Sequence, residues 1–342
     1  MIVRKPIVVV GSINMDLVAI ADHIPVVGET VAGSDFQTYY GGKGANQAVA
    51  IARLGYPVQL IGRLGSDRFG EELSAGLQRE GVDITGVKRV DGTSGIAVIV
   101  VSSHGENCIV VTPGANAALS ANDLESYVEQ IRSASLVLAQ LETPIQTVLR
   151  LAEICEREGV PFMLDPAPAQ TLPDQMLPLI TWFTPNETEA GFFTNGLFPR
   201  EKDDNHTAMA HALLHTGVRN LLLKMGERGF HVATADGEFQ SRPAYSVLAV
   251  DTTAAGDAFN GAFAVALVSG KSSVESACFA AAAAAISVTR NGAQSSMPTL
   301  QEVQAYVQST LFELTDSPTA LYQQSETTTD ATASLENTPH ES

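Results

Sequence analysis

The chain has 342 residues, 45 % of them hydrophobic, which is enough to bury one large core. Its 38 acidic and 20 basic residues give a formal net charge of -18, which argues against the clustered basic surface that nucleic-acid binding needs. No window approaches the roughly 18 uninterrupted apolar residues of a membrane helix. The 3 cysteines are far apart, so neither a disulfide framework nor a Cys-x-x-Cys metal knuckle is available. We expect a globular protein without nucleic-acid or membrane partners.

The N-terminal residues lead directly into a β-branched run over 4–10, typical of a strand buried on both faces. They lack the apolar segment and small-residue cleavage site of a secretory signal, so we expect a cytoplasmic protein. Small and polar residues follow over Gly11–Asp16. In an α/β protein this end of the strand carries functional side chains.

Helical and strand-like segments then alternate along the chain. A helix is expected over 44–54 and another over 144–158. Strands are expected at 58–62, 135–141, 160–164, 182–184 and 220–224. This order predicts an α/β fold with a largely parallel sheet flanked by helices.

Two segments, 29–40 and 95–111, alternate or run in β-branched residues with turn residues between them. They predict antiparallel hairpins in a separate small sheet, with strands from approximately 15–40 and 95–112. Such a sheet would form a lid over the carboxyl ends of the parallel strands. We expect one folded domain over 1–312, followed over 313–342 by an acidic, Ser- and Thr-rich disordered tail.

The segment Asp251–Ala262 ends a strand-like run in small residues and then opens an apolar segment with helical spacing. Backbone N–H groups of Ala254, Ala255 and Gly256 can closely approach an anion at a helix start. Asp257 would repel a phosphate there unless it accepts a proton from an attacking hydroxyl. The pattern therefore indicates a kinase that acts on an alcohol. The alternative is an ordinary glycine-containing turn with Asp257 as a partner of the helix dipole.

A second loop of small residues, Gly41–Gln47, precedes a helix and would direct Lys43 and Asn46 toward whatever it encloses. Its spacing is not that of a P-loop, and no Gly-x-Gly-x-x-Gly fingerprint follows the first strand. Taken alone, the loop could equally be a packing turn.

Five segments in order resemble the ribokinase (PfkB) family of carbohydrate kinases from about Ile7 to Tyr306: Gly11–Asp16, Gly41–Gln47, Asn186–Glu189, Asp251–Asp257 and Val288–Gln294. The resemblance implies a ribokinase-like fold and ATP-dependent phosphorylation of D-ribose at O5. A kinase for 2-deoxyribose, fructose or adenosine stays open. So does a catalytically silent sugar- or nucleotide-binding regulator, although such a protein is expected to have lost the base or the anion hole.

The resemblance also implies roles for individual residues. Asp257 matches the catalytic base, and Ala254, Ala255 and Gly256 match the anion hole. Sugar-binding positions are matched by Asn14, Asp16, Gly42, Lys43, Asn46, Glu142 and Asp257. ATP-binding positions are matched by Asn186, Lys224, Gly226, Glu227, Gly229, Gly256 and Ala281. Lys224 stands where Thr or another small polar residue is frequent, and Ala281 where many relatives have His or Asn.

For the metals, Glu189 matches a carboxylate that organises Mg²⁺ through water. Potassium, the monovalent activator, would be bound mostly by backbone carbonyls around Asp251, Thr253, Ser287, Arg290, Gly292 and Ser296. Relatives pair their lids, so the resemblance also implies a homodimer.

His206, His211 and His215 have a spacing that metal ligands can have, but no neighbouring Glu completes a His-Glu-x-x-His site. We expect a solvent-facing helix there. Trp182 is expected in the core, and 280–285 in a close-packed helix.

Overall fold

The computed structural model describes residues 4–197 and 205–316 of the chain. By their internal contacts the residues divide into a large unit that ends at Val303 and a second that begins at Gln304. The large unit contains both sheets.

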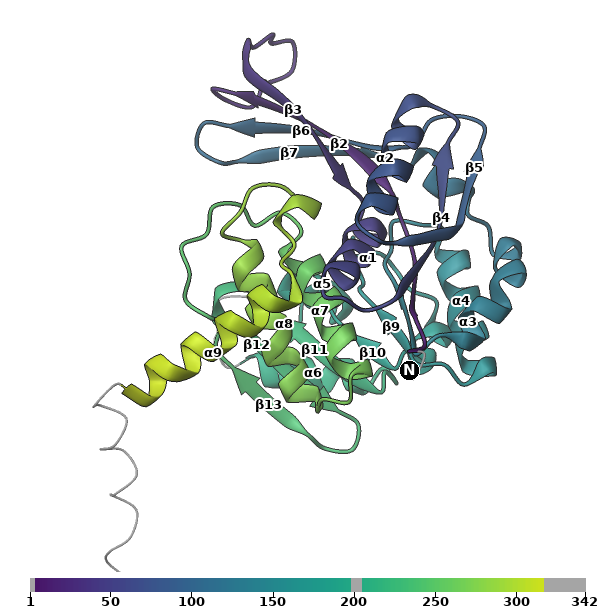
Figure 1. Ribbon diagram of the computed structural model, residues 1–342, viewed down its shortest axis with the longest axis vertical. Helices are drawn as coiled ribbons and strands as arrows, with labels where there is room; N and C mark the ends of the chain where they lie inside the picture. Colours follow the sequence, from purple (N-terminus) through teal and green to yellow (C-terminus); the bar gives the residue numbers. More distant parts are fainter. Residues whose placement is uncertain (1–3, 198–204, 317–342) are drawn as a thin grey trace, which may run out of the picture. The chain divides into compact units, whose positions relative to one another are not determined.

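In the described part of the chain, the main sheet has nine strands in the order β13-β12-β11-β10-β9-β8-β1-β4-β5 (Figure 1). Within this sheet, every pair of neighbours from β11 through β10, β9, β8, β1 and β4 to β5 is parallel. The pairs β11–β12 and β12–β13 are antiparallel. Their bounds are β1 Ile7–Val10, β4 Val58–Gly65, β5 Asp83–Val90, β8 Leu136–Ala139, β9 Phe162–Leu164, β10 Trp182–Phe183, β11 Asn220–Lys224, β12 Phe230–Thr234 and β13 Phe239–Arg242. The predicted α/β fold with a largely parallel sheet is confirmed.

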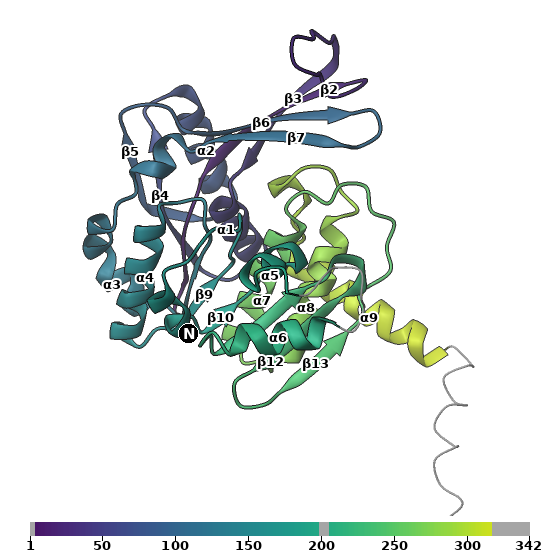
Figure 2. The same cartoon turned by 180° about the vertical axis from the view of Figure 1, so that it is seen from behind.

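Helices cover both faces of this sheet (Figures 1 and 2). Helix α7 packs against both α1 and α8 on one face, and α3, α4 and α6 lie on the other. The helices are α1 Lys43–Arg53, α2 Arg68–Arg79, α3 Val128–Ser133, α4 Ile145–Glu158, α5 Glu187–Phe193, α6 Asn205–Leu214, α7 Ala255–Val268 and α8 Ser273–Ser287. Short 3₁₀ helices are η1 Gly114–Ala118, η2 Asn122–Tyr127, η3 Asp174–Leu179, η4 Gly226–Arg228 and η5 Gln294–Ser296.

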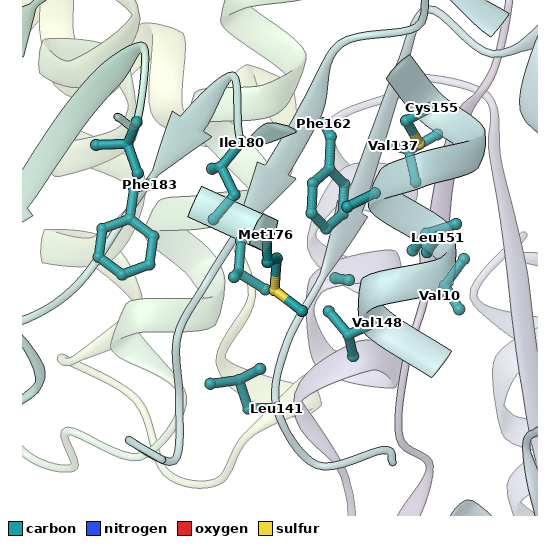
Figure 3. Packing of buried hydrophobic residues seen from close by; sticks show 14 of the residues in the cluster. Val10, Val137, Leu141, Val148, Leu151, Cys155, Phe162, Met176, Ile180 and Phe183 are labelled. Atoms are coloured by element: carbon teal, nitrogen blue, oxygen red, sulfur yellow. The ribbon is translucent and has the colours of Figure 1, made fainter. Parts of the chain in front are cut away.

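Alternate strand residues point to opposite faces, which explains why the central strands are apolar throughout. On one face, Val137 and Phe162 belong to a buried cluster with Leu151 of α4 (Figure 3). On the other face, Trp182 packs edge-on against Phe263 of α7 with ring centroids 4.9 Å apart. The expectation that Trp182 is a core residue is confirmed.

The small sheet has the order β3-β2-β6-β7, with β2 Asn14–Ala21, β3 Gly33–Gly41, β6 Gly95–Ser102 and β7 Asn107–Thr112. The pairs β2–β3 and β6–β7 are antiparallel, as predicted. Strands β2 and β6, which join the two pairs, are parallel. This parallel pairing was not predicted, because strand periodicity does not identify strand partners.

Helix α9 spans Leu300–Asp316 and so continues past residue 312, the expected end of the folded domain. Residues 317–342 of the expected tail lie outside the described residues, and the domain boundary stays a prediction. Across 4–197 and 205–316, no helix combines the length and apolar character that a membrane span requires.

The histidine segment forms α6 and the turn that follows it. His211 and His215 are exposed, whereas His206 is half-buried and its Nε2 lies 2.9 Å from Oε1 of Glu187. The described residues contain no group of three His, Cys, Asp or Glu side chains able to hold a metal ion. His206 therefore differs from the expected solvent-facing position because it packs against the start of α5.

Candidate active site

A pocket of about 1170 Å³ lies at the carboxyl ends of the parallel strands, bordered by the small sheet and the first turn of α7. The predicted sugar-binding, anion-hole and nucleotide-binding residues all line it: Asn14, Asp16, Gly42, Lys43, Asn46, Glu142, Asn186, Lys224, Gly226, Glu227, Gly229, Ala254, Ala255, Gly256, Asp257 and Ala281. Glu189 and Thr253 line it as well. Residues dispersed over most of the chain thus share one cavity.

The first turn of α7 presents backbone amides to this pocket. Ala254 precedes the helix in the left-handed conformation, with φ 58°, which is uncommon for a residue with a side chain. The Ala255 amide donates to the Thr252 carbonyl, and no side chain caps the helix. The amides of Gly256 and Asp257 lie in the first turn, where no carbonyl within the helix is available. This helix start can therefore bind an anion.

Asp257 lies in that first turn and is 5 % exposed. Its Oδ2 accepts from Nδ2 of Asn46 and its Oδ1 from Nε2 of Gln47, both at 2.9 Å. Burial raises the pKa of Asp257 to about 6, and nearby Asp165 acts in the same direction, whereas Lys43 and the two amides oppose the rise. A carboxylate with this pKa is ionised at neutral pH and basic enough to accept a proton.

Close contact between α1 and α7 brings these amides to Asp257. A Cβ at Gly261 of α7 would lie only 2.7 Å from the Cβ of Ala50 in α1. At the other end of α1, a Cβ at Gly44 would lie 2.6 Å from the carbonyl carbon of Gly11. Glycine at both positions lets α1 pack tightly enough for its first turn to reach the base.

The loop before α1 forms the opposite wall of the site. Gly42 has φ 86°, and a Cβ there would lie 2.7 Å from the Asn14 amide nitrogen, so both conformation and space require glycine. The Lys43 amide donates to Oε2 of Glu142 at 3.0 Å, and the Ser12 hydroxyl donates to the same oxygen. These bonds fix the Glu142 carboxylate at the edge of the pocket.

Charges in this wall strongly affect one another. Burial raises the pKa of Asp16 to about 7, and the carboxylates of Glu142 and Asp257 add to the rise. Burial alone would lower the pKa of Lys43, but Asp257, Glu142 and further carboxylates raise it above its usual value. Lys43 is therefore a permanent cation among acids. Together these groups offer hydrogen-bond donors and acceptors suited to a polyol.

Asn186 and Glu189 form a capping box at the start of α5. The Asn186 side chain accepts from the Glu189 amide at 2.9 Å, and the Glu189 carboxylate accepts from the Asn186 amide at 2.7 Å. Glu189 is 8 % exposed, and burial raises its pKa. Asn186 is thus a helix cap, and the same box directs a buried carboxylate to the pocket wall.

The loop after β11 forms the next part of the wall. Lys224 ends β11, and its Nζ lies 3.0 Å from Oδ1 of Asp165. Gly226 and Gly229 follow with φ 56° and 95°, and a Cβ at Gly229 would lie 2.0 Å from the Arg242 carbonyl oxygen. The glycines therefore allow a tight turn next to the pocket. Ala281 of α8 also lines the cavity.

The residues predicted to surround potassium come from two segments: Asp251 and Thr253 lie just before α7, whereas Ser287 ends α8 and Arg290, Gly292 and Ser296 follow it. The Asp251 carboxylate accepts the amides of Thr253 and Gly292, both at 2.8 Å, and these bonds help to hold its pKa below the usual value although burial opposes this. Ser287 and Ser296 are buried, and Arg290 pairs with Glu302 at 2.6 Å. The segment before the anion site is thus tied to the loop after α8.

Several pocket residues were not singled out from the sequence. Asp165 lines the pocket, is 2 % exposed and accepts from Gln47. Asn116 lies behind the pocket lining and donates to Oδ1 of Asn14 at 2.7 Å. Apolar residues of the small sheet also line the pocket: Ala97, Ile99, Ile109 and Val111. Asp165 directly follows the strand expected at 160–164. Like Gly11–Asp16 after the first strand, it could therefore have been predicted as a functional residue from its position at a strand end.

Nearly the whole of the large unit is similar in sequence to a known protein family. Residues 4–300 match the model of the pfkB family carbohydrate kinases. The chain belongs to this family. The resemblance noted from five sequence segments is confirmed, and the family match covers both the pocket and the small sheet.

Individual members of the pfkB family are similar over nearly their full length. A ribokinase of Haemophilus influenzae is 42 % identical over 89 % of this chain and 99 % of its own. A deoxyribokinase of Salmonella typhi is 37 % identical over 88 % of this chain and 98 % of its own. The structure of Arabidopsis thaliana ribokinase complexed with ribose and ATP matches with a TM-score of 0.84 and 36 % identity, over 89 % of this chain and 99 % of that one. The ribokinase-like fold is thereby confirmed.

Proposed function

We propose that this protein transfers the γ-phosphoryl group of ATP to O5 of D-ribose and yields D-ribose 5-phosphate and ADP. The observation that carries the proposal is the position of Asp257, a buried carboxylate with a raised pKa in the first turn of the helix whose amides can bind an anion. The pocket that contains it also holds a polar wall suited to a sugar. The similar Arabidopsis ribokinase is complexed with ribose and ATP, which supports the choice of these two substrates.

In the proposed reaction, the sugar lies against the polar wall formed by Asn14, Asp16, Gly42, Lys43, Asn46 and Glu142. Asp257 accepts the proton of the 5-hydroxyl as its oxygen attacks the γ-phosphorus in line with the departing ADP. The first-turn amides around Gly256 stabilise charge on the transferred group, since they are already oriented toward it. ATP lies along the wall that includes Asn186, Lys224, Gly226, Glu227, Gly229 and Ala281.

Two metal ions fit the residues present. Glu189 offers a buried carboxylate at the pocket wall and would organise Mg²⁺ through water. Bound with ATP, Mg²⁺ supplies neutralisation of phosphate charge. Potassium would be held mostly by backbone carbonyls around Asp251, Thr253, Ser287, Arg290, Gly292 and Ser296. The Asp251 carboxylate accepts from the amides of Thr253 and Gly292, and so joins the segment before α7 to the loop after α8.

Apolar side chains of the small sheet complete the proposed site. Ile99 of β6, with Ile109 and Val111 of β7, lines the same pocket as Asp257. An apolar cover excludes water, which would otherwise compete with the sugar hydroxyl for the phosphoryl group. The small sheet is therefore the proposed lid.

A coupled assay of ADP release with Mg²⁺ and potassium tests the activity. We expect stimulation by D-ribose well above that by 2-deoxyribose, fructose, adenosine or no sugar, and a lower rate when sodium replaces potassium. A strong preference for 2-deoxyribose, which the deoxyribokinase relative makes a specific alternative, would keep the mechanism and change the substrate. Silence with every acceptor, despite binding of sugar or nucleotide, would instead favour a non-catalytic regulator.

We further propose that the protein is a homodimer through its small sheet. Phe36, Val98 and Val110 are 60, 45 and 61 % exposed on this sheet, and exposed edge strands with apolar side chains require a cover. Sedimentation velocity at micromolar concentration should show a dimer, and Val110→Lys should shift it to monomer. A monomer over that concentration range for the unmodified chain would contradict the proposal.

A cytoplasmic location is part of the proposed function. ATP is the co-substrate, and the cysteines Cys108, Cys155 and Cys278 are free thiols in the structure. Thiols persist in reducing compartments. Cell fractionation that places the protein with secreted or periplasmic markers would contradict this location.

A further inference from the structure

The Lys224 ammonium lies inside the candidate active site, next to the anion-binding turn. The side chain is 12 % exposed, and its partner Asp165 is 3 % exposed. A Cβ built on Gly256 would lie 3.7 Å from Nζ of Lys224. The ammonium is thus adjacent to the first turn of α7, where a phosphoryl group is expected.

Asp165 connects this ammonium to the proposed base. One carboxylate oxygen, Oδ1, contacts Lys224 at 3.0 Å, and the other, Oδ2, accepts from Nε2 of Gln47 at 2.9 Å. The same nitrogen donates to Oδ1 of Asp257, also at 2.9 Å. Because Oε1 of Gln47 accepts from Nε2 of Gln140, the orientation of the Gln47 amide is fixed, and both its N–H groups serve carboxylates.

An ammonium has three donors, and the contact with Asp165 occupies one of them. Lys224 also lines the pocket, so it has both a fixed anchor and access to a ligand. An ammonium in a site of low dielectric attracts phosphate oxygens strongly and needs no reorganisation when they arrive. If the ion pair served only to join β9 to β11, a position beside Gly256 would not be required.

We infer that Lys224 binds the polyphosphate of ATP, and that Asp165 is a positioning residue that anchors this cation and joins it through Gln47 to Asp257. The inference rests on the proposed function for the identity of the nucleotide. In this arrangement the Lys224 ammonium and the first-turn amides of α7 both contact the phosphates, and Lys224 lies on the nucleotide side of the pocket.

The test is the affinity for ATP and for AMP, measured by titration calorimetry without sugar for Lys224→Met, Lys224→Arg and the double variant Lys224→Met/Asp165→Asn. The single Met variant leaves the buried Asp165 without its cation and can fold poorly, whereas the double variant removes both charges. We expect the double variant to bind ATP ~10-fold or more weakly, as for loss of a charge-assisted hydrogen bond, and AMP within about twofold of wild type. Lys224→Arg should keep most of the ATP affinity.

An unchanged ATP affinity in the folded double variant would overturn the inference, as would equal losses for ATP and AMP, which indicate a structural role. A wild-type chain that binds no ATP would overturn it too. The sugar assay is a separate readout: ATP binding that depends on Lys224, in a protein that does not phosphorylate ribose, supports the inference while the proposed function fails. With ribose turnover present, the double variant should raise the KM for ATP and leave the KM for ribose unchanged.

Discussion

Asp257→Asn is expected to lower turnover with D-ribose by at least ~10². An amide cannot accept the proton of the attacking hydroxyl, although it has nearly the same shape as the carboxylate. Oδ1 of the variant can still accept from Gln47. The Asn46 amide, whose Oδ1 has no hydrogen-bond partner in wild type, can turn to accept from the new Nδ2, so the packing between α1 and α7 should persist. The measurement is the coupled assay at saturating ribose and ATP.

Stability gives this prediction an internal control. Burial raises the pKa of Asp257 from 3.8 to about 6, so the ionised form is disfavoured in the fold at neutral pH, and a neutral Asn removes that cost. We therefore expect a melting temperature no lower than that of wild type. Asp91→Asn, a change at an exposed turn, should affect neither quantity. A folded Asp257→Asn protein with near-normal turnover would refute the assignment of the base.

Local patterns predicted the elements that position the site. The alternation of β-branched and helix-periodic segments identified the main sheet, and small residues before Asp257 identified the start of α7. These features depend on residues close in sequence, so they can be read without knowledge of the fold. The Asn186 cap belongs to the same class, because a capping box spans only one turn.

Contacts between distant segments could not be predicted in this way. The parallel pairing of β2 with β6 joins Asn14 to Gly95, and neither strand specifies the other. The Gln47 amide meets Asp165 and Asp257 only because Gly261 lets two helices approach. Roles for the sugar, ATP and potassium positions came from the family resemblance, and the geometry supplies their surroundings.

The raised pKa values of Asp16 and Asp257 could be predicted only from the three-dimensional structure. Asp16 and Asp257 lie far apart in the sequence, but Asp257 is buried and Asp16 is half-buried, and Asp257 is close enough to raise the cost of ionising Asp16. Lys43 is the cation that offsets this cluster of acids. The sequence identified Lys43 as a candidate site residue, whereas the effect of Lys43 on the pKa of Asp257 depends on burial and on the distance between the two groups.

Lys43→Met is expected to move the acid limb of the pH–rate profile upward. The base acts when deprotonated, so turnover falls as pH drops through the pKa of Asp257, which lies at about 6 with Lys43 present. Lys43 lowers that pKa, and Asp165 raises it. Without the ammonium the pKa must rise, and a shift of at least ~1 unit is expected for loss of a close opposite charge. At neutral pH less of the base is then ionised.

Measuring kcat at saturating ribose from about pH 5 to pH 9 separates this electrostatic effect from weaker sugar binding. We expect kcat/KM for ribose at neutral pH to fall by ~10² in total, since a shifted base and a lost sugar contact combine. Lys43→Arg keeps the charge and should restore the wild-type midpoint, and Lys271→Met, at an exposed position, should leave the whole profile unchanged. If the Lys43→Met midpoint coincided with that of wild type while kcat fell, Lys43 would act on the sugar alone, and the electrostatic coupling to Asp257 would be wrong.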